Sequence, residues 1–119
     1  MNVLIVDDEQ PARQRLRLLV EERPDLTVVG EAANGNEALA LTESLQPDVV
    51  LLDIRMPGMN GIEVARHIDT GDAAPAVIFT TAYDEYAIDA FDAHAVGYLL
   101  KPVRRERLFK ALDHAARIS

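Results

Sequence analysis

Three carboxylates stand where two short apolar runs end. Asp7 and Asp8 follow the run Val3–Val6, and Asp53 follows the run Val49–Leu52. If those runs are neighbouring strands, the carboxylates converge. Two carboxylates about 4 Å apart repel each other by roughly 4 kcal/mol at an effective dielectric constant near 20, so a purely structural role does not explain three together. A hard divalent cation relieves the repulsion, and a few oxygen ligands that leave room for water and phosphate suit Mg²⁺ better than Ca²⁺.

A cation and a hydroxyl complete the predicted chemistry. Lys101 follows the apolar run Val96–Leu100, and Thr80 and Thr81 end another run. An ammonium and a neutral donor beside a metal-bound carboxylate suit a phosphoryl group, whose charge lies on its equatorial oxygens. An ionised carboxylate is already a nucleophile, so Asp53 needs no separate base to attack phosphorus.

The surrounding sequence predicts the elements that position these residues. Five short apolar runs are typical of strands that helices cover on both faces. The runs are Val3–Val6, Thr27–Val29, Val49–Leu52, Ala76–Phe79 and Val96–Leu100. A stripe of apolar residues at helical spacing follows each run. The stripes are Ala12, Leu16, Leu19 and Val20; Ala38, Leu41 and Leu45; Ile62, Ala65 and Ile68; Ala87, Ile88 and Phe91; and Leu108, Leu112 and Ala115.

Residues that start helices agree with this division. Pro11 suits the first turn of a helix, where its missing N–H costs nothing. Asn34 followed by Glu37, and Asn60 followed by Glu63, are typical capping boxes.

Five strand–helix units with short links predict an α/β fold. The expected architecture is a (βα)₅ flavodoxin-like, doubly wound parallel sheet with strand order 2-1-3-4-5. Ligands of such sheets bind at the carboxyl ends of the strands, where the strand order reverses. Here that point lies between the first and third strands, where Asp7, Asp8 and Asp53 are expected.

Composition narrows the classes of function. The chain has 119 residues, with 12 basic and 20 acidic side chains and a formal net charge of −8. That charge argues against binding nucleic acid or an anionic membrane through bulk electrostatics. There is no cysteine, which excludes disulfides, thiolate zinc sites and cysteine nucleophiles. With no apolar run of membrane-spanning length and no secretory signal, we expect a soluble cytoplasmic protein with no membrane partner.

In order, these residues resemble the receiver domains of two-component response regulators (the CheY-like superfamily) over essentially the whole chain. The pair Asp7 and Asp8 matches the acidic pair of that family, and Asp53 within Leu51–Gly61 matches its phosphoacceptor motif. The dipeptide Thr81-Ala82 matches the family's hydroxyl and small residue.

Two further stretches extend the resemblance. Gly97–Pro102 is similar to the family segment that carries the switch aromatic, here Tyr98, and the phosphate-binding lysine, here Lys101. The sequence from Tyr83–Ile88 through to that segment resembles the LytTR-type (LytR/AlgR) subgroup in particular.

The resemblance implies a metal and a phosphoacceptor. Asp53 would accept a phosphoryl group from a sensor histidine kinase. Asp8, Asp53 and the backbone carbonyl of Arg55 would hold Mg²⁺, with Asp7 assisting directly or through water.

It also implies a switch. Thr81 and Lys101 would bind the phosphoryl oxygens and complete the catalytic set with Asp53. Thr81 would move toward the phosphoryl group and vacate space into which the ring of Tyr98 can turn. The Lys101–Pro102 peptide bond is expected to be cis, which non-proline bonds rarely are.

Two bulky side chains flank the direction from which water would attack. Arg55 stands two residues beyond Asp53, and Tyr83 stands two residues beyond Thr81. We expect them to screen the phosphoryl group and slow its hydrolysis.

We expect residues 1–119 to form one receiver domain that catalyses only its own phosphorylation and dephosphorylation. Transcription regulation and DNA contact would need an output domain absent from this chain. Phosphorylation would promote a homodimer through the face made by the fourth helix, fifth strand and fifth helix. The charged residues expected on that face are Arg104, Arg105, Arg107, Asp84, Glu85 and Asp89.

Other functions fit the same residues less well. A Mg²⁺-dependent phosphatase with an aspartyl-phosphate intermediate would want a second Asp where Arg55 stands. A nucleotide- or flavin-binding module would want a Gly-rich phosphate loop, whereas Asp7–Gln10 repels phosphate unless a metal intervenes. A receiver-like module that binds partners without phosphorylation remains open.

Overall fold

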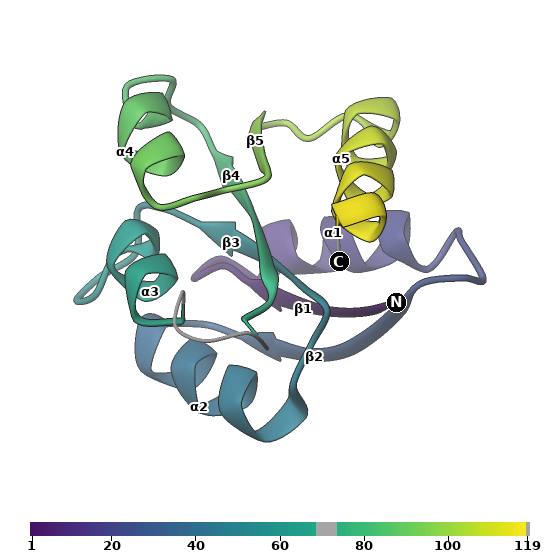
Figure 1. Cartoon of the computed structure of the whole chain (residues 1–119), viewed down its shortest axis with the longest axis horizontal. Coiled ribbons are helices and arrows are strands. Elements are labelled where there is room, and N and C mark those ends of the chain that lie inside the picture. The colour runs from purple at the N-terminus through teal and green to yellow at the C-terminus, as the bar shows by residue number, and fades with distance from the viewer. Residues whose placement is uncertain (69–73, 119) are drawn as a thin grey trace.

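Strands and helices alternate along the chain in the computed structural model, which describes residues 1–68 and 74–118. Pro11 lies in the first turn of the first helix, as predicted. In chain order (Figure 1), the elements are β1 (Asn2–Val6), α1 (Gln10–Val20), β2 (Thr27–Ala32), α2 (Gly35–Leu45), β3 (Val49–Asp53), α3 (Gly61–Ile68), β4 (Ala76–Thr81), α4 (Ala87–Asp92), β5 (Gly97–Leu100) and α5 (Arg105–Ile118).

The five strands form one parallel sheet in the predicted order, β2-β1-β3-β4-β5. Val6 pairs with Leu52 on β3, and Asp53 pairs with Thr80 on β4. This register brings the carboxyl ends of β1, β3 and β4 to the same level, which is why residues far apart in sequence meet there.

Helices cover both faces of the sheet. Figure 1 shows α1 and α5 on one side and α2, α3 and α4 on the other. One core lies under α1 and α5, and a second lies under the other three helices. All five residues of β3 are buried, as expected for a central strand between two helical layers. The predicted apolar stripes of α1, α3 and α5 face these cores through Leu16, Leu19, Val20, Ile62, Ala65, Ile68, Leu108, Leu112 and Ala115.

The predicted stripe of α4 is wrong. Ile88 and Phe91 are 77% and 80% exposed, while Ala90 and Ala93 are buried. Ala90 and Ala93 belong to the same core as Phe79, so the small side chains of this segment are the ones that face the sheet. The larger apolar residues of α4 therefore point outward.

Side-chain caps fix two helix starts. Asn60 and Glu63 exchange hydrogen bonds, with each backbone N–H donating to the other side chain at 3.2 and 3.0 Å. Asn34 accepts from the Glu37 N–H at 2.9 Å, but the Glu37 carboxylate accepts from Ala33, one residue earlier than a capping box requires. Among the described residues, no helix has the length and apolar character to cross a membrane.

Candidate functional site

Asp7, Asp8 and Asp53 meet at the carboxyl ends of β1 and β3. One carboxylate oxygen from each lies within 4.8 Å of the others. Asp7 and Asp53 are buried, whereas Asp8 is exposed. This carboxylate cluster is thus closed on the sheet side and open to solvent at Asp8. Hard oxygen ligands with one open side fit a Mg²⁺ ion that keeps several waters.

Asp7 is held in place through every polar group it has. Its Oδ1 accepts from the Glu9 N–H at 2.9 Å, and its Oδ2 accepts from Lys101 Nζ at 2.7 Å. Its backbone carbonyl accepts from Arg13 at 2.7 Å, and its N–H donates to Ala32. Because both carboxylate oxygens of Asp7 already have donors, Asp8 and Asp53 are the carboxylates with more freedom to bind a cation.

Lys101 joins the carboxylate cluster from the end of β5. Its Nζ lies 2.7 Å from Asp7 and 3.3 Å from Asp53. Its backbone N–H donates to the carbonyl of Thr81 at 2.7 Å, and the Lys101–Pro102 peptide bond is cis, as expected. Burial lowers the pKa of Lys101, but the hydrogen bonds and charges of Asp7 and Asp53 outweigh it and raise that pKa overall. The ammonium therefore stays charged and available for an anion.

The burial of Asp53 makes its charge costly. Burial, followed by repulsion from Asp7, raises the pKa of Asp53 to about 7, although Lys101 acts in the opposite direction. Without a cation, Asp53 is thus partly protonated near neutral pH. A divalent cation at the cluster would favour the ionised carboxylate, which is the form that acts as a nucleophile.

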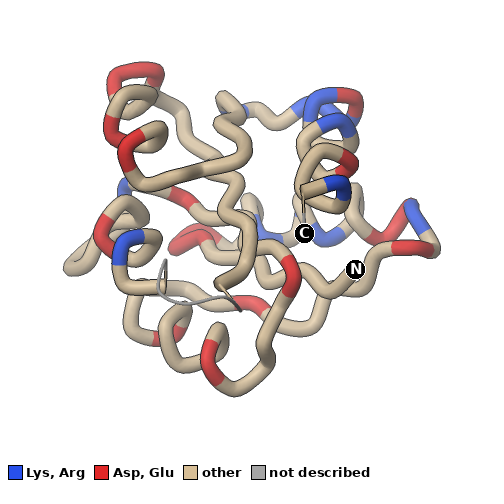
Figure 2. The backbone as a smooth tube through the Cα atoms, viewed as in Figure 1, with Lys and Arg blue, Asp and Glu red and all other residues tan. Residues whose placement is uncertain are grey.

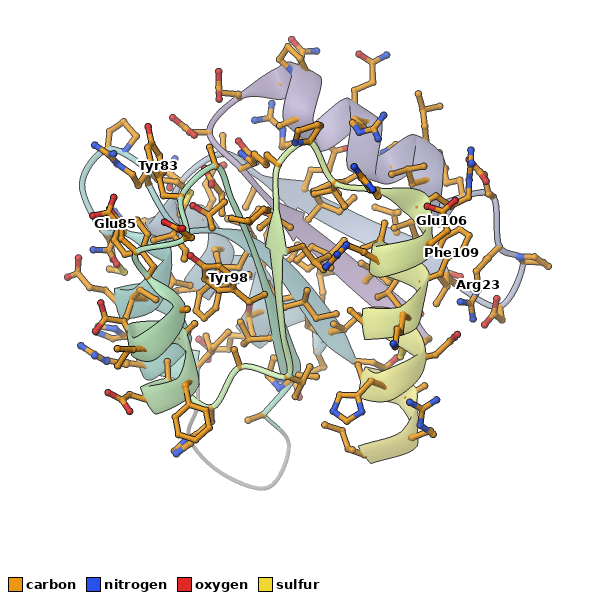
Figure 3. The ribbon with its side chains drawn as sticks, turned by 90° about the horizontal axis from the view of Figure 1, so that it is seen from above. Arg23, Tyr83, Glu85, Tyr98, Glu106 and Phe109 are labelled. Carbon is orange, nitrogen blue, oxygen red and sulfur yellow. The ribbon has the colours of Figure 1, made fainter. Side chains whose placement is uncertain are left out.

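Thr81 lies at the end of β4, and its hydroxyl is bonded to the backbone just beyond that strand. This buried hydroxyl accepts from the Tyr83 N–H at 3.2 Å. The Tyr98 hydroxyl donates to the carbonyl of the same Tyr83. Burial raises the pKa of Tyr98, so its hydroxyl remains a donor. Tyr83 and Tyr98 both lie on the side of the molecule that α4 occupies (Figure 3).

Tyr83 thus connects the two predicted switch residues, a role that sequence reasoning did not assign to it. The connection runs through the backbone N–H and carbonyl of Tyr83, and every residue except proline has both groups. No side-chain type could have marked it. The guanidinium of Arg55 also packs on the Tyr83 ring, so the two residues predicted to screen the site do touch.

One of the three arginines predicted for the α4–β5–α5 face lies elsewhere. Arg105 forms two hydrogen bonds with Glu22 on the α1–β2 link, at 2.7 and 3.0 Å. The guanidinium carbon of Arg23, the residue after Glu22, lies 5.2 Å from the centre of the Phe109 ring of α5, and Figure 3 labels both residues. Arg105 therefore connects the start of α5 to the α1–β2 link. It points away from the predicted face because successive residues of a helix point in different directions.

The other two arginines do line the predicted face. Arg104 and Arg107 border a groove together with Asp84, Tyr98 and Leu100. The acidic residues of α4 and the basic residues at the start of α5 lie on either side of β5 (Figure 2). We use the name α4–β5–α5 face for this groove together with the exposed Ile88 and Phe91 of α4.

Several known proteins are similar to this chain in sequence. A family model described as the response regulator receiver domain matches residues 3–113. The positive alginate biosynthesis regulatory protein of Pseudomonas aeruginosa is 57% identical over 118 residues, which is 98% of this chain and 48% of that protein. The transcriptional regulatory protein BtsR of Escherichia coli K12 is 46% identical over 112 residues, 94% of this chain and 46% of that protein. The chain spans about half the length of the curated relatives it matches.

Solved structures share the fold. The response regulatory domain of protein mrkE from Klebsiella pneumoniae has a TM-score of 0.90 and 31% identity, covering 99% of this chain and 97% of that one. A signal receiver domain of the putative response regulator NarL from Mycobacterium tuberculosis has a TM-score of 0.88 and 38% identity, covering 97% of this chain and 95% of that one. With the family match over 111 consecutive positions, residues 3–113, the chain belongs to the response regulator receiver domain family.

Proposed function

We propose that this domain receives a phosphoryl group from a sensor histidine kinase on Asp53. The observation that carries the proposal is the position of Asp53 itself, buried beside Asp7 and 3.3 Å from the Lys101 ammonium. A carboxylate oxygen of Asp53 would attack phosphorus, and the phosphorus–nitrogen bond of a phosphohistidine would break. The histidine keeps that electron pair, and Asp53 becomes an acyl phosphate.

Mg²⁺ is the cation that we propose for the carboxylate cluster. Asp8, Asp53 and the backbone carbonyl of Arg55 would hold it, with Asp7 assisting directly or through water. When bound, Mg²⁺ neutralises negative charge on the carboxylates and on the phosphoryl oxygens. The exposed side of Asp8 supports this assignment, since it leaves a path for a hydrated ion.

Lys101 and Thr81 would hold the phosphoryl oxygens. Lys101 already points at Asp53, so its ammonium needs only a small movement to meet a new oxygen. The Thr81 hydroxyl accepts from the Tyr83 N–H, so a movement of Thr81 toward the phosphoryl group would lengthen or break that hydrogen bond. Because the carbonyl of Tyr83 accepts from Tyr98, that change would also disturb Tyr98 and so reach the molecular surface.

Phosphorylation would change how the domain binds a partner through the α4–β5–α5 face. Ile88 and Phe91 offer exposed apolar surface on α4, while Arg104 and Arg107 offer positive charge across the groove. A second copy of the domain would supply complementary charge, because α4 is acidic and the start of α5 is basic. We propose a phosphorylation-dependent homodimer through this face.

The relatives suggest the output. BtsR is a transcriptional regulatory protein, and it is about twice as long as this chain. We therefore propose that the domain acts in a LytTR-type transcription regulator and that an output domain outside these residues binds DNA. The net charge of −8 supports assigning DNA contact to another domain.

Labelling with acetyl phosphate tests the proposal. In the presence of Mg²⁺, intact mass should show one added phosphoryl group on the wild type and none on Asp53→Asn. Asp92→Asn, an exposed carboxylate of α4, is the matched control and should be labelled like the wild type. Equal labelling of the Asp53 variant would refute the assignment. An unlabelled wild type would favour a module that binds partners without phosphorylation, and release of phosphate from added phosphomonoesters would favour a phosphatase.

A further inference from the structure

Thr80 carries a buried hydroxyl without a partner. The residue lies in β4 and is fully buried, and its Oγ1 has no hydrogen bond to any residue within 1–68 or 74–118. Buried polar side-chain atoms nearly always have a partner, and an unsatisfied one destabilises the fold. Valine has the same shape and would avoid that cost. A threonine at this position therefore needs an explanation.

The hydroxyl lies on the sheet face that α1 and α5 cover. Side chains alternate between the two faces of a strand, so Thr80 shares its face with Ile78. Ile78 belongs to the core under α1 and α5, whereas Phe79 belongs to the opposite core. Thr81 thus faces the side of α4, and Thr80 faces away from it. The two neighbouring hydroxyls serve different faces of the sheet.

The same alternation places the site residues beside Thr80. Thr80 is the register partner of Asp53 on β3, and Leu51, two residues before Asp53, belongs to the α1–α5 core. On the other side Thr80 pairs with Leu99 of β5, which also belongs to that core. Lys101 stands two residues beyond Leu99, just past the end of β5, and its ammonium reaches Asp53, which shares its face of β3 with Leu51.

The side chain of Lys101 must pass over the end of β4. It starts beyond β5 and reaches Asp53 beyond β3, and β4 lies between those two strands. Thr80 is the residue of β4 that faces this crossing. The strand order and register thus place Thr80 between the start of the Lys101 side chain and Asp53.

The Lys101 ammonium has an unused hydrogen-bond donor, and the Thr80 hydroxyl has an unused acceptor. An ammonium has three N–H donors, and among the described residues those of Lys101 go to Asp7 at 2.7 Å and Asp53 at 3.3 Å. One donor is left over. A threonine hydroxyl can accept one hydrogen bond and donate another at the same time.

We propose that Thr80 is a positioning residue for Lys101. Its hydroxyl accepts the third N–H of the ammonium when Lys101 exchanges Asp7 for an oxygen of the phosphoryl group. The ammonium then keeps an acceptor on the sheet side and is held pointing at Asp53. This inference rests on the proposed function, because it assumes that Lys101 binds a phosphoryl group on Asp53.

Replacing Thr80 by valine and by serine tests the inference. Thr80→Val keeps the shape and removes the hydroxyl, whereas Thr80→Ser keeps the hydroxyl. With beryllofluoride and Mg²⁺ as the phosphoryl mimic, Thr80→Val should bind about tenfold more weakly than the wild type, the effect of one hydrogen bond to a charged group. Thr80→Ser should bind within about twofold of the wild type.

The NMR signals of the Lys101 side chain give a readout that packing alone would not move. In the beryllofluoride complex, the ε-carbon signal of Lys101 should differ between the wild type and Thr80→Val and should return with Thr80→Ser. Urea unfolding of each variant establishes that it is folded, and Thr80→Ala replaces Thr80→Val if the valine does not fit.

The possible failures are distinguishable. If the wild type binds beryllofluoride and Thr80→Val binds it equally well with an unchanged Lys101 signal, the role of Thr80 is wrong while the proposed function stands. If the wild type neither binds beryllofluoride nor becomes phosphorylated, the proposed function fails and the role of Thr80 fails with it.

Discussion

The guanidinium carbon of Arg55 lies 4.4 Å from the centre of the Tyr83 ring. The two residues come from different strand ends, Arg55 two positions beyond Asp53 and Tyr83 two beyond Thr81. A cation over an aromatic ring at an exposed site is worth about 0.5–1 kcal/mol. The two side chains therefore support each other, and we expect the pair to act as one cover over a phosphoryl group on Asp53.

Removing this cover should shorten the life of the phosphorylated domain. We expect Arg55→Ala combined with Tyr83→Ala to speed hydrolysis of the acyl phosphate about three- to tenfold, because about 1 kcal/mol of barrier corresponds to such a factor. The rate follows from the loss of the phosphorylated mass with time after acetyl phosphate is removed. Arg117→Ala, an exposed arginine at the end of α5, is the control and should leave the lifetime unchanged. An equal lifetime in the double variant would rule out screening.

The raised pKa of Asp53 predicts a pH dependence of stability in the absence of divalent metal. With a pKa of about 7 in the folded domain and an ordinary value of 3.8 when unfolded, the folded state holds the extra proton between these values. The free energy of unfolding should thus fall as pH rises from about 4 to about 7. The Asp53→Asn variant has no carboxyl group to ionise at this position, so its free energy of unfolding should not fall in this way. We expect it to be more stable than the wild type by roughly 2–4 kcal/mol at pH 8 and by little at pH 4.

Urea unfolding in EDTA across this pH range measures the difference. Asp92→Asn should follow the wild type at every pH, since Asp92 is exposed. A constant difference between Asp53→Asn and the wild type would show that the Asp53 carboxyl does not titrate near neutral pH.

Mg²⁺ should stabilise the folded domain through Asp8. A ligand that binds only the folded state adds about 2.7 kcal/mol at a concentration one hundred times its dissociation constant. We expect Asp8→Asn to lose most of this gain, because Asp8 is the exposed member of the carboxylate cluster. Thermal unfolding with and without Mg²⁺ measures the gain. The neighbouring Glu9→Gln removes one exposed negative charge as well, so an equal loss there would point to general screening instead of a ligand.

Gly61 is required for the start of α3 to approach Asp53. A Cβ atom at Gly61 would clash with the backbone carbonyl oxygen of Asp53, which cannot move aside as a side chain does. We expect Gly61→Ala to destabilise the domain by about 3 kcal/mol or more and to lower the rate of phosphorylation. A Cβ atom at Gly58 would have no described neighbour within 4 Å, and the cost there comes from its φ of +78°. Gly58→Ala should therefore cost about 1 kcal/mol in the same urea titration.

The sequence predicted the structure correctly where one hydrophobic pattern clearly dominated. Runs of buried residues such as those around Leu51 marked the strands, and the residue after each run then had to lie at the carboxyl end of the sheet. Asp7, Asp8, Asp53 and Lys101 could be brought together from the sequence on this basis.

The prediction was wrong where the sequence offers two apolar stripes on one helix. The segment around α4 has one apolar stripe through Ile88 and Phe91 and another through Ala90 and Ala93, and in the folded domain the smaller pair is buried in the core that contains Phe79. The direction of Arg105 depends on Glu22, which lies 83 residues away in sequence. Contacts of that kind follow from the assembled fold and not from local spacing.

The outward apolar residues of α4 lead to a last prediction, on association. Beryllofluoride with Mg²⁺ should shift the wild type from monomer to dimer in sedimentation velocity, because a moved Tyr98 would change the surface beside α4. Phe91→Ser and Ile88→Ser should each weaken the activated dimer about tenfold or more, since both side chains are largely exposed and available to a second copy.

Two controls separate this face from the rest of the molecule. Leu18→Ser removes a leucine of α1 that is 63% exposed on the opposite side of the sheet, and it should leave the dimer intact. Arg105→Glu should also leave it intact, because Arg105 is bonded to Glu22, whereas Arg107→Glu should weaken it. If the activated wild type stays monomeric, or if Leu18→Ser disrupts the dimer and Phe91→Ser does not, association does not use the α4–β5–α5 face.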